Sequence, residues 1–103
     1  MVASKGYLLP AKGTDVASAS SITLGKGTFF LVTGTTNVDT IVTTGWTAGD
    51  TIVLTFDNNL TMNNNAGNLH LAGDFATSTD YTLTLVFNGT NWVETGRTSY
   101  VAP

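Results

Sequence analysis

Apolar residues recur at every second position through most of the chain after residue 21, and threonine fills many of the positions between them. The clearest runs are residues 52–56 (IVLTF) and 83–87 (LTLVF). A period of two places alternate side chains on opposite faces of a β-strand, and the β-branched threonine suits a pleated, half-buried surface. No window shows a helical period with capping residues. The sequence therefore predicts an all-β domain of short strands, arranged as a β-sandwich, a barrel or a β-helix-like unit.

Turn signals separate these runs. Asn88-Gly89 stands between LVF and TNW and predicts a hairpin with a two-residue turn, because both central positions of such a turn need positive φ. Asp57-Asn58-Asn59 predicts another turn. Residues 50–59 resemble residues 80–89 at a spacing that is typical of repeat units, although two independent hairpin patterns explain the likeness about as well.

The chain divides near residue 21. Residues 1–21 are rich in Ala, Ser and Gly, with one apolar cluster, Tyr7, Leu8 and Leu9, that ends at Pro10. Such a segment cannot bury its own cluster. We therefore predict an extended N-terminal arm over residues 1–21, which binds a partner through Tyr7, Leu8 and Leu9, followed by an all-β domain over residues 22–103.

The charge content limits the partners. Charged residues make up only 11% of the chain, the net charge is −3, and the four basic residues are scattered. Phosphate contacts require clustered Lys and Arg, so nucleic acid is not expected as a partner. No apolar run approaches the length of a membrane helix, so no membrane partner is expected either. The chain has no cysteine, which excludes disulfides and thiolate metal sites.

Candidate catalytic groups are few. His70 is the only histidine, and its flanking leucines predict that it points away from the core. The acids lie mostly beside Gly or Asn, where an aspartate commonly caps a turn; they are Asp15, Asp39, Asp50, Asp57, Asp74, Asp80 and Glu94. We expect no cofactor, no metal and no enzymatic activity. A polysaccharide-cleaving enzyme that uses two of the acids is the least favoured alternative.

The aromatic residues indicate an interaction surface. At Phe29-Phe30 the alternation sends one ring inward and leaves the other exposed, which favours a partner chain as its cover. We predict a subunit contact that involves Phe29, Phe30 and Trp46. The alternative is a surface on which sugars stack, drawn from Phe29, Phe30, Trp46, Tyr81, Trp92 and Tyr100.

Five segments together form a recognisable pattern over roughly residues 16–97: ASASSITL (17–24), GTFFLVTGTT (27–36), AGDTIVLTF (48–56), LHLAG (69–73) and NGTNW (88–92). This pattern resembles a module of virion proteins in tailed bacteriophages, especially tail fibres and spikes. The resemblance implies an intertwined or β-helical homotrimer. It implies no active-site residue, because its motifs are patterned rather than catalytic.

For a chain this short, the resemblance implies a capsid decoration (cement) protein. Such a protein is made in the host cytoplasm, is located on the virion surface, and binds the phage major capsid protein as a trimer that stabilises the head. The alternative is a fibre or spike module that binds a cell-surface glycan. A chain cut from a longer fibre favours the alternative.

Overall fold

The computed structural model describes residues 11–101, which form ten strands and no helix, so the predicted all-β class is confirmed. In chain order the strands are β1 (Val16–Ala17), β2 (Ser21–Ile22), β3 (Phe29–Thr33), β4 (Thr40–Ile41), β5 (Thr51–Phe56), β6 (Thr61–Met62), β7 (Leu69–His70), β8 (Phe75–Ala76), β9 (Thr82–Phe87) and β10 (Trp92–Thr98). Only β3, β5, β9 and β10 have five or more residues, as the short alternating runs predict.

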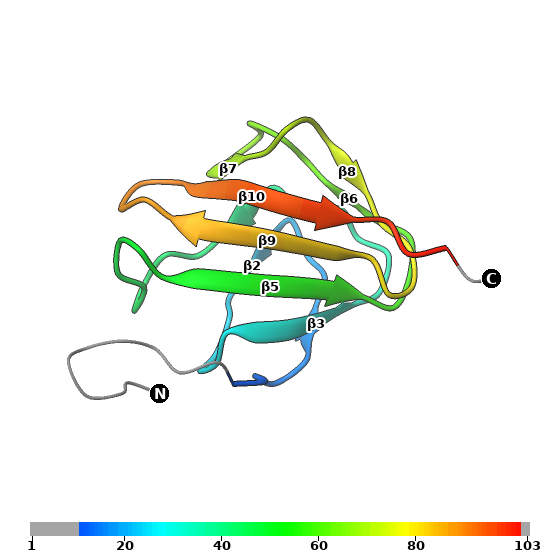
Figure 1. The fold of residues 1–103 in the computed structure, drawn as a ribbon, viewed down its shortest axis with the longest axis horizontal. Coiled ribbons are helices and arrows are strands. Elements are labelled where there is room, and N and C mark those ends of the chain that lie inside the picture. Colours follow the sequence, from blue (N-terminus) through cyan, green and yellow to red (C-terminus); the bar gives the residue numbers. More distant parts are fainter. Residues whose placement is uncertain (1–10, 102–103) are drawn as a thin grey trace.

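One six-stranded sheet dominates the molecule and curls as a half-barrel (Figure 1). Its strand order is β1-β3-β5-β9-β10-β7. β1, β3 and β5 run parallel, β5, β9 and β10 are antiparallel, and β7 is parallel to β10. Two small sheets, parallel β2–β4 and antiparallel β6–β8, face the concave side. The half-barrel thus combines a parallel part and an antiparallel part.

The parallel part arises because the chain leaves the large sheet through β2 after β1 and through β4 after β3. Each time it re-enters the large sheet in the same direction, as β3 and then as β5. Val16 in β1 pairs with Val32 in β3, and Val32 pairs with Phe56 in β5. On the other side Ile22 in β2 pairs with Ile41 in β4. Each return therefore stacks one buried apolar residue on another, and the columns of side chains fill the space between the sheets.

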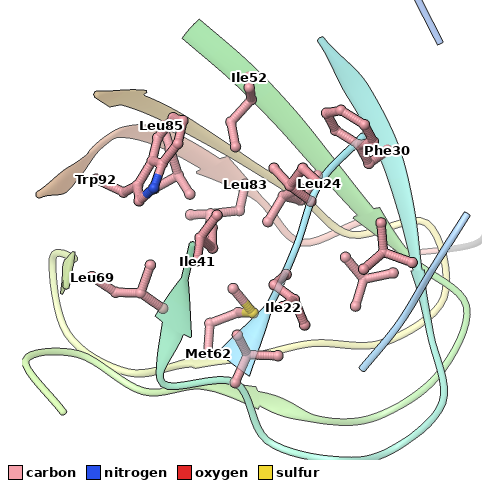
Figure 2. Close-up of a cluster of buried hydrophobic side chains, with 14 of the residues drawn as sticks. Ile22, Leu24, Phe30, Ile41, Ile52, Met62, Leu69, Leu83, Leu85 and Trp92 are labelled. Atoms are coloured by element: carbon pink, nitrogen blue, oxygen red, sulfur yellow. The ribbon is translucent and has the colours of Figure 1, made fainter. Parts of the chain in front are cut away.

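The core lies inside this curl. Figure 2 shows side chains from the large sheet and from the β2–β4 side pointing toward one another, among them Phe30, Ile52, Leu85 and Ile41. Each of these four is fully buried. The strict alternation of buried and less buried residues in β3, β5 and β9 leaves the convex face of the sheet outside the core. The sequence pattern thus determines which side chains face inward.

The predicted turn at Asn88-Gly89 needs correction. The hairpin at residues 88–91 exists, but its central residues are Gly89 and Thr90, because Asn88 N–H donates to the Asn91 carbonyl at 3.0 Å. Only Gly89 has positive φ, at 99°. The Asn88 side chain instead accepts from the N–H groups of Thr90 and Asn91, which fixes the turn one residue later than predicted.

The two similar segments, residues 50–59 and 80–89, contain β5 and β9. These strands are antiparallel neighbours, with Ile52 opposite Leu85 and Leu54 opposite Leu83. Successive units of a solenoid stack in the same direction. The likeness therefore reflects two adjacent strands of one sheet with the same burial pattern.

Part of the predicted arm belongs to the sheet. Tyr7, Leu8 and Leu9 lie outside the described residues. From residue 11 onward the chain follows β3: Lys12 bridges to Phe29, and the Ala11 carbonyl accepts the N–H of Thr28 at 2.7 Å. β1 then pairs with β3. The chain around Lys12 and the two residues of β1 thus line β3 at one edge of the half-barrel.

Candidate assembly surface

The convex side of the large sheet presents a continuous set of uncharged side chains, here called the outer face. It consists of the residues that alternate with the buried ones in β3, β5 and β9, together with Val93 of β10. None of the ten is charged; they are Phe29, Leu31, Thr33, Thr51, Val53, Thr55, Thr82, Thr84, Val86 and Val93. In a protein of net charge −3, two copies can meet at these ten residues without bringing acids together, and among residues 11–101 the one charged residue that borders them beside Phe29 is Lys12.

The strand register mixes apolar and hydroxyl groups across the outer face. Phe29 pairs with Val53, which pairs with Thr84 on its other side. The neighbouring row contains Val86, with Thr51 on one side and Val93 on the other. Side chains directly opposite on one face of a sheet contact each other. The face therefore carries apolar area between hydroxyls that can pair with a partner or with water.

The three aromatic residues predicted to contact a subunit differ in how deeply they are buried. Phe30 is fully buried, whereas its neighbour Phe29 is 37% exposed on the outer face. Trp46 is half-buried and packs edge-on against Phe30 and Trp92, with ring centroids 6.4 and 5.4 Å apart. Of the three, Phe29 remains the residue that can give a large area to a partner, and Phe30 belongs to the core.

Most of the acids accept structural hydrogen bonds, and Asp50 caps its own turn as predicted. Asp50 accepts from the Thr47 N–H at 2.8 Å and closes the turn before β5. Other acids tie distant loops together: Asp57 accepts from Gly34 N–H, Asp74 from Asn64 N–H, and Asp39 from the Asn63 side-chain amide. These carboxylates hold the loops that connect the strands.

Glu94 and Arg97 form an ion pair on the concave side of β10. Arg97 Nη2 donates to Glu94 Oε1 at 2.7 Å and to the Gly73 carbonyl at 2.8 Å, and its guanidinium lies 4.5 Å from the ring centre of Phe75. Glu94 Oε1 also accepts from the Ala72 N–H at 2.9 Å. The hydrogen bond from Arg97 lowers the pKa of Glu94, and the same bond raises the pKa of Arg97. This pair fastens the 72–74 loop to β10.

Sequence reasoning missed this pair because of a β-bulge. Residues three apart in a regular strand point to opposite faces. The register of β10 against β9 shifts between Glu94 and Gly96, so Thr95 is the extra residue, and both charged side chains reach the same side. Nothing in the alternation of the sequence marks this position as a bulge.

His70 has the position that the sequence pattern predicts, whereas Trp92, named for the alternative sugar-stacking surface, is fully buried. His70 is exposed, as predicted, and pairs with Val93 at the edge of the outer face. Among residues 11–101, no three of the His, Asp and Glu side chains are grouped so that they could hold a metal ion. The same residues contain no helix that is long and apolar enough to cross a membrane.

No protein-family model matches the chain, and no curated protein sequence matches it significantly.

Proposed function

We propose that this chain is a non-enzymatic structural protein of a tailed-bacteriophage virion, which assembles as a homotrimer and binds the outside of the head as a decoration protein. The observation that supports this most strongly is the outer face: ten adjacent positions on a curved sheet without one charged residue. In the proposal, that face is the contact with a neighbouring copy.

The energetics favour such a contact. Burying apolar surface contributes about 25 cal/mol per Å², and a stable interface needs about 800 Å² per partner. Two copies of net charge −3 repel each other wherever their acids approach. The outer face avoids both this repulsion and the cost of desolvating ions. The threonine methyl groups add apolar area while the hydroxyls can hydrogen-bond across the contact.

The proposed trimer on the head also gives roles to the predicted contact residues. Phe29 contacts the neighbouring subunit, and Phe30 and Trp46 support the sheet beneath it. Tyr7, Leu8 and Leu9 bind the neighbouring subunit or the phage major capsid protein. The parallel return of the chain through β1, β3 and β5 is the kind of winding that a β-helix-like unit uses, and it supports the resemblance to virion modules. The protein is then located on the virion surface.

A structural role also agrees with how the polar groups are used. Asp39, Asp50, Asp57 and Asp74 accept hydrogen bonds that hold loops, and Glu94 is paired with Arg97. These groups stabilise the connections between strands. A second candidate function, recognition of a cell-surface glycan, is favoured by a separate feature, a polar groove beside β6 and β8.

Two measurements test the proposal. Sedimentation equilibrium of the pure protein at micromolar concentration should give three times the chain mass of 10.8 kDa. Electron microscopy of virions with and without the protein should show extra density on the head when it is present. A stable monomer in the first experiment, or heads of identical appearance in the second, would contradict the proposal.

A further inference from the structure

A groove lies beside the small β6–β8 sheet, at the end of the molecule where β9 begins. It is open to solvent, with a volume of about 510 Å³. Its polar walls are Asn37, Asn59, Thr61, Ser78 and Tyr81. None of these residues belongs to the outer face, so the groove is a separate surface of the protein.

The groove offers several hydrogen-bonding groups that residues 11–101 do not use. The hydroxyls of Thr61, Ser78 and Tyr81 have no partner within this part of the chain, and neither does the side-chain amide of Asn59. A hydroxyl donates and accepts, and an amide provides both a donor and an acceptor. The groove therefore presents both hydrogen-bond donors and hydrogen-bond acceptors along one short stretch of surface.

The walls are fixed by hydrogen bonds to the backbone. Asn37 Oδ1 accepts from the Thr61 N–H at 2.8 Å, which joins the 37 loop to β6. On the floor, the Thr77 hydroxyl accepts from Leu60 N–H at 3.2 Å and donates to the Asn58 carbonyl at 3.0 Å. Because these bonds hold both sides of the groove, a ligand that binds there does not have to order them.

Tyr81 provides a rigid aromatic wall. Its ring lies nearly parallel to that of Phe75, at 22° and 6.0 Å, and its carbonyl accepts the Thr55 hydroxyl at 3.1 Å. A tyrosine held in this way presents an apolar body with a polar tip. A sugar ring has the same mixed character, with C–H groups and hydroxyls on one small frame.

The charges near the groove select against anionic ligands. None of the groove residues is charged, and the acids nearest in the chain are Asp57 and Asp80, which disfavour an anion. Uncharged hydroxyl and amide groups beside a tyrosine instead match an uncharged polyhydroxylated ligand. We propose that this groove binds a neutral oligosaccharide, with Asn59, Ser78 and Tyr81 as hydrogen-bonding residues. The site does not require the trimer or the capsid.

The first test is a printed array of neutral, sialylated and sulfated oligosaccharides, probed with the full-length protein. We expect binding to neutral members. The tightest neutral oligosaccharide is then titrated calorimetrically, as a soluble monovalent compound, into wild type and variants. No binding to any neutral member, or a preference for the sialylated or sulfated members, would overturn the proposal.

The variants remove single groups without disturbing the core. Asn59→Ala and Tyr81→Phe should each weaken the binding about two- to tenfold, which corresponds to one uncharged hydrogen bond. Asn91→Ala is the matched control, because Asn91 lies in the β9–β10 hairpin at the other end of β9. Its affinity should equal that of wild type. If Asn59→Ala and Tyr81→Phe both bind like wild type, the sugar does not occupy this groove, whatever the outcome for the trimer.

Discussion

Glu94 and Arg97 show how a protein with few charged residues uses an ion pair. The Glu94 side chain is only 7% exposed and that of Arg97 is 27% exposed. A carboxylate at this depth stays ionised because it accepts hydrogen bonds from Arg97 and from the Ala72 N–H. By contrast, the Lys12–Asp15 pair is more than half exposed on both sides. The first pair should contribute to stability and the second should contribute little.

The pH dependence of stability checks this contrast. The pKa of Glu94 is lowered from its ordinary value of 4.5, chiefly by the hydrogen bond from Arg97. Its stabilisation is therefore complete above pH 4.5 and is lost as the pH falls through the lowered, folded-state pKa. We expect Glu94→Gln to reduce the free energy of unfolding by about 1–3 kcal/mol at pH 7. The difference from wild type should shrink progressively below pH 4.5.

Urea unfolding at several pH values and one fixed protein concentration measures this difference. Asp15→Asn is the control, and it should change the free energy of unfolding by less than about 1 kcal/mol at pH 7 because its ion pair is exposed. If the effect of Glu94→Gln is the same at pH 7 and at pH 2, the ionised carboxylate is not the source of the stabilisation.

Among the elements, β4 is completed in an unusual way. One edge of β4 pairs with β2, which leaves the N–H and carbonyl of Ile41 facing away from that strand. The side-chain amide of Asn68 occupies this edge: Ile41 N–H donates to its Oδ1 at 3.0 Å, and its Nδ2 donates to the Ile41 carbonyl at 2.7 Å. One side chain thus replaces the backbone of a third strand.

Gly67 makes this approach possible. A Cβ at that position would lie 2.6 Å from the Asp39 carbonyl oxygen and would overlap the Thr40 hydroxyl. Only glycine lets the segment before β7 pass so close to β4.

Replacing Asn68 should therefore open the edge of β4. Asn68→Leu leaves the N–H and the carbonyl of Ile41 unpaired, and we expect a loss of about 2–4 kcal/mol in the free energy of unfolding, together with faster hydrogen exchange of the Ile41 amide. Asn68→Asp keeps the acceptor for the Ile41 N–H but places an oxygen against the Ile41 carbonyl, so it should also destabilise the fold while slowing exchange at Ile41 relative to Asn68→Leu. Unchanged exchange at Ile41 in Asn68→Leu would show that the amide does not protect this edge.

The example of Asn68 also explains what the sequence could predict and what it could not. Alternation in residues 52–56 and 83–87 identifies the strands and their buried face, because each side chain position follows from a period of two. The pairing partners depend on contacts between distant segments. The parallel return of β1 and β3, the bulge at Thr95 and the strand-like role of Asn68 all leave no local pattern in the sequence.

The outer face and the groove also depend on contacts between distant segments, which the local sequence pattern does not predict. Alternation predicts that one of Phe29 and Phe30 is exposed, and the buried neighbour Val32 indicates in retrospect that Phe30 is the inner one. The outer face as a whole needs the strand order, since its residues come from β3, β5, β9 and β10. The groove also needs the tertiary structure, because its lining residues 37, 59–61, 76–78 and 81 meet only in the folded chain.

At the scale of the whole molecule, the proposals divide the surface into two parts with different chemistry. The outer face offers apolar and threonine side chains on the convex sheet, and the groove offers amides and hydroxyls beside β6 and β8. The core lies between the sheets, so a change on the convex side need not disturb the groove. The two functions should therefore be separable by substitution.

Val53→Lys makes the separation measurable. Val53 is half-buried at the middle of the outer face, between Phe29 and Thr84, so a lysine there places a charge in the proposed subunit contact. We expect the trimer to weaken by at least about 2 kcal/mol per contact, because the ammonium loses water without gaining a partner. Sedimentation equilibrium should then show mainly monomer at micromolar concentration, while near-UV circular dichroism and binding of the neutral oligosaccharide remain those of wild type.

Thr44→Lys, in the exposed turn between β4 and β5, adds the same charge away from the outer face and should leave the trimer intact. A trimer of unchanged stability in Val53→Lys would place the subunit contact elsewhere. The free strand edge at β1 would then be the next surface to test, because β3 is its only neighbour among residues 11–101.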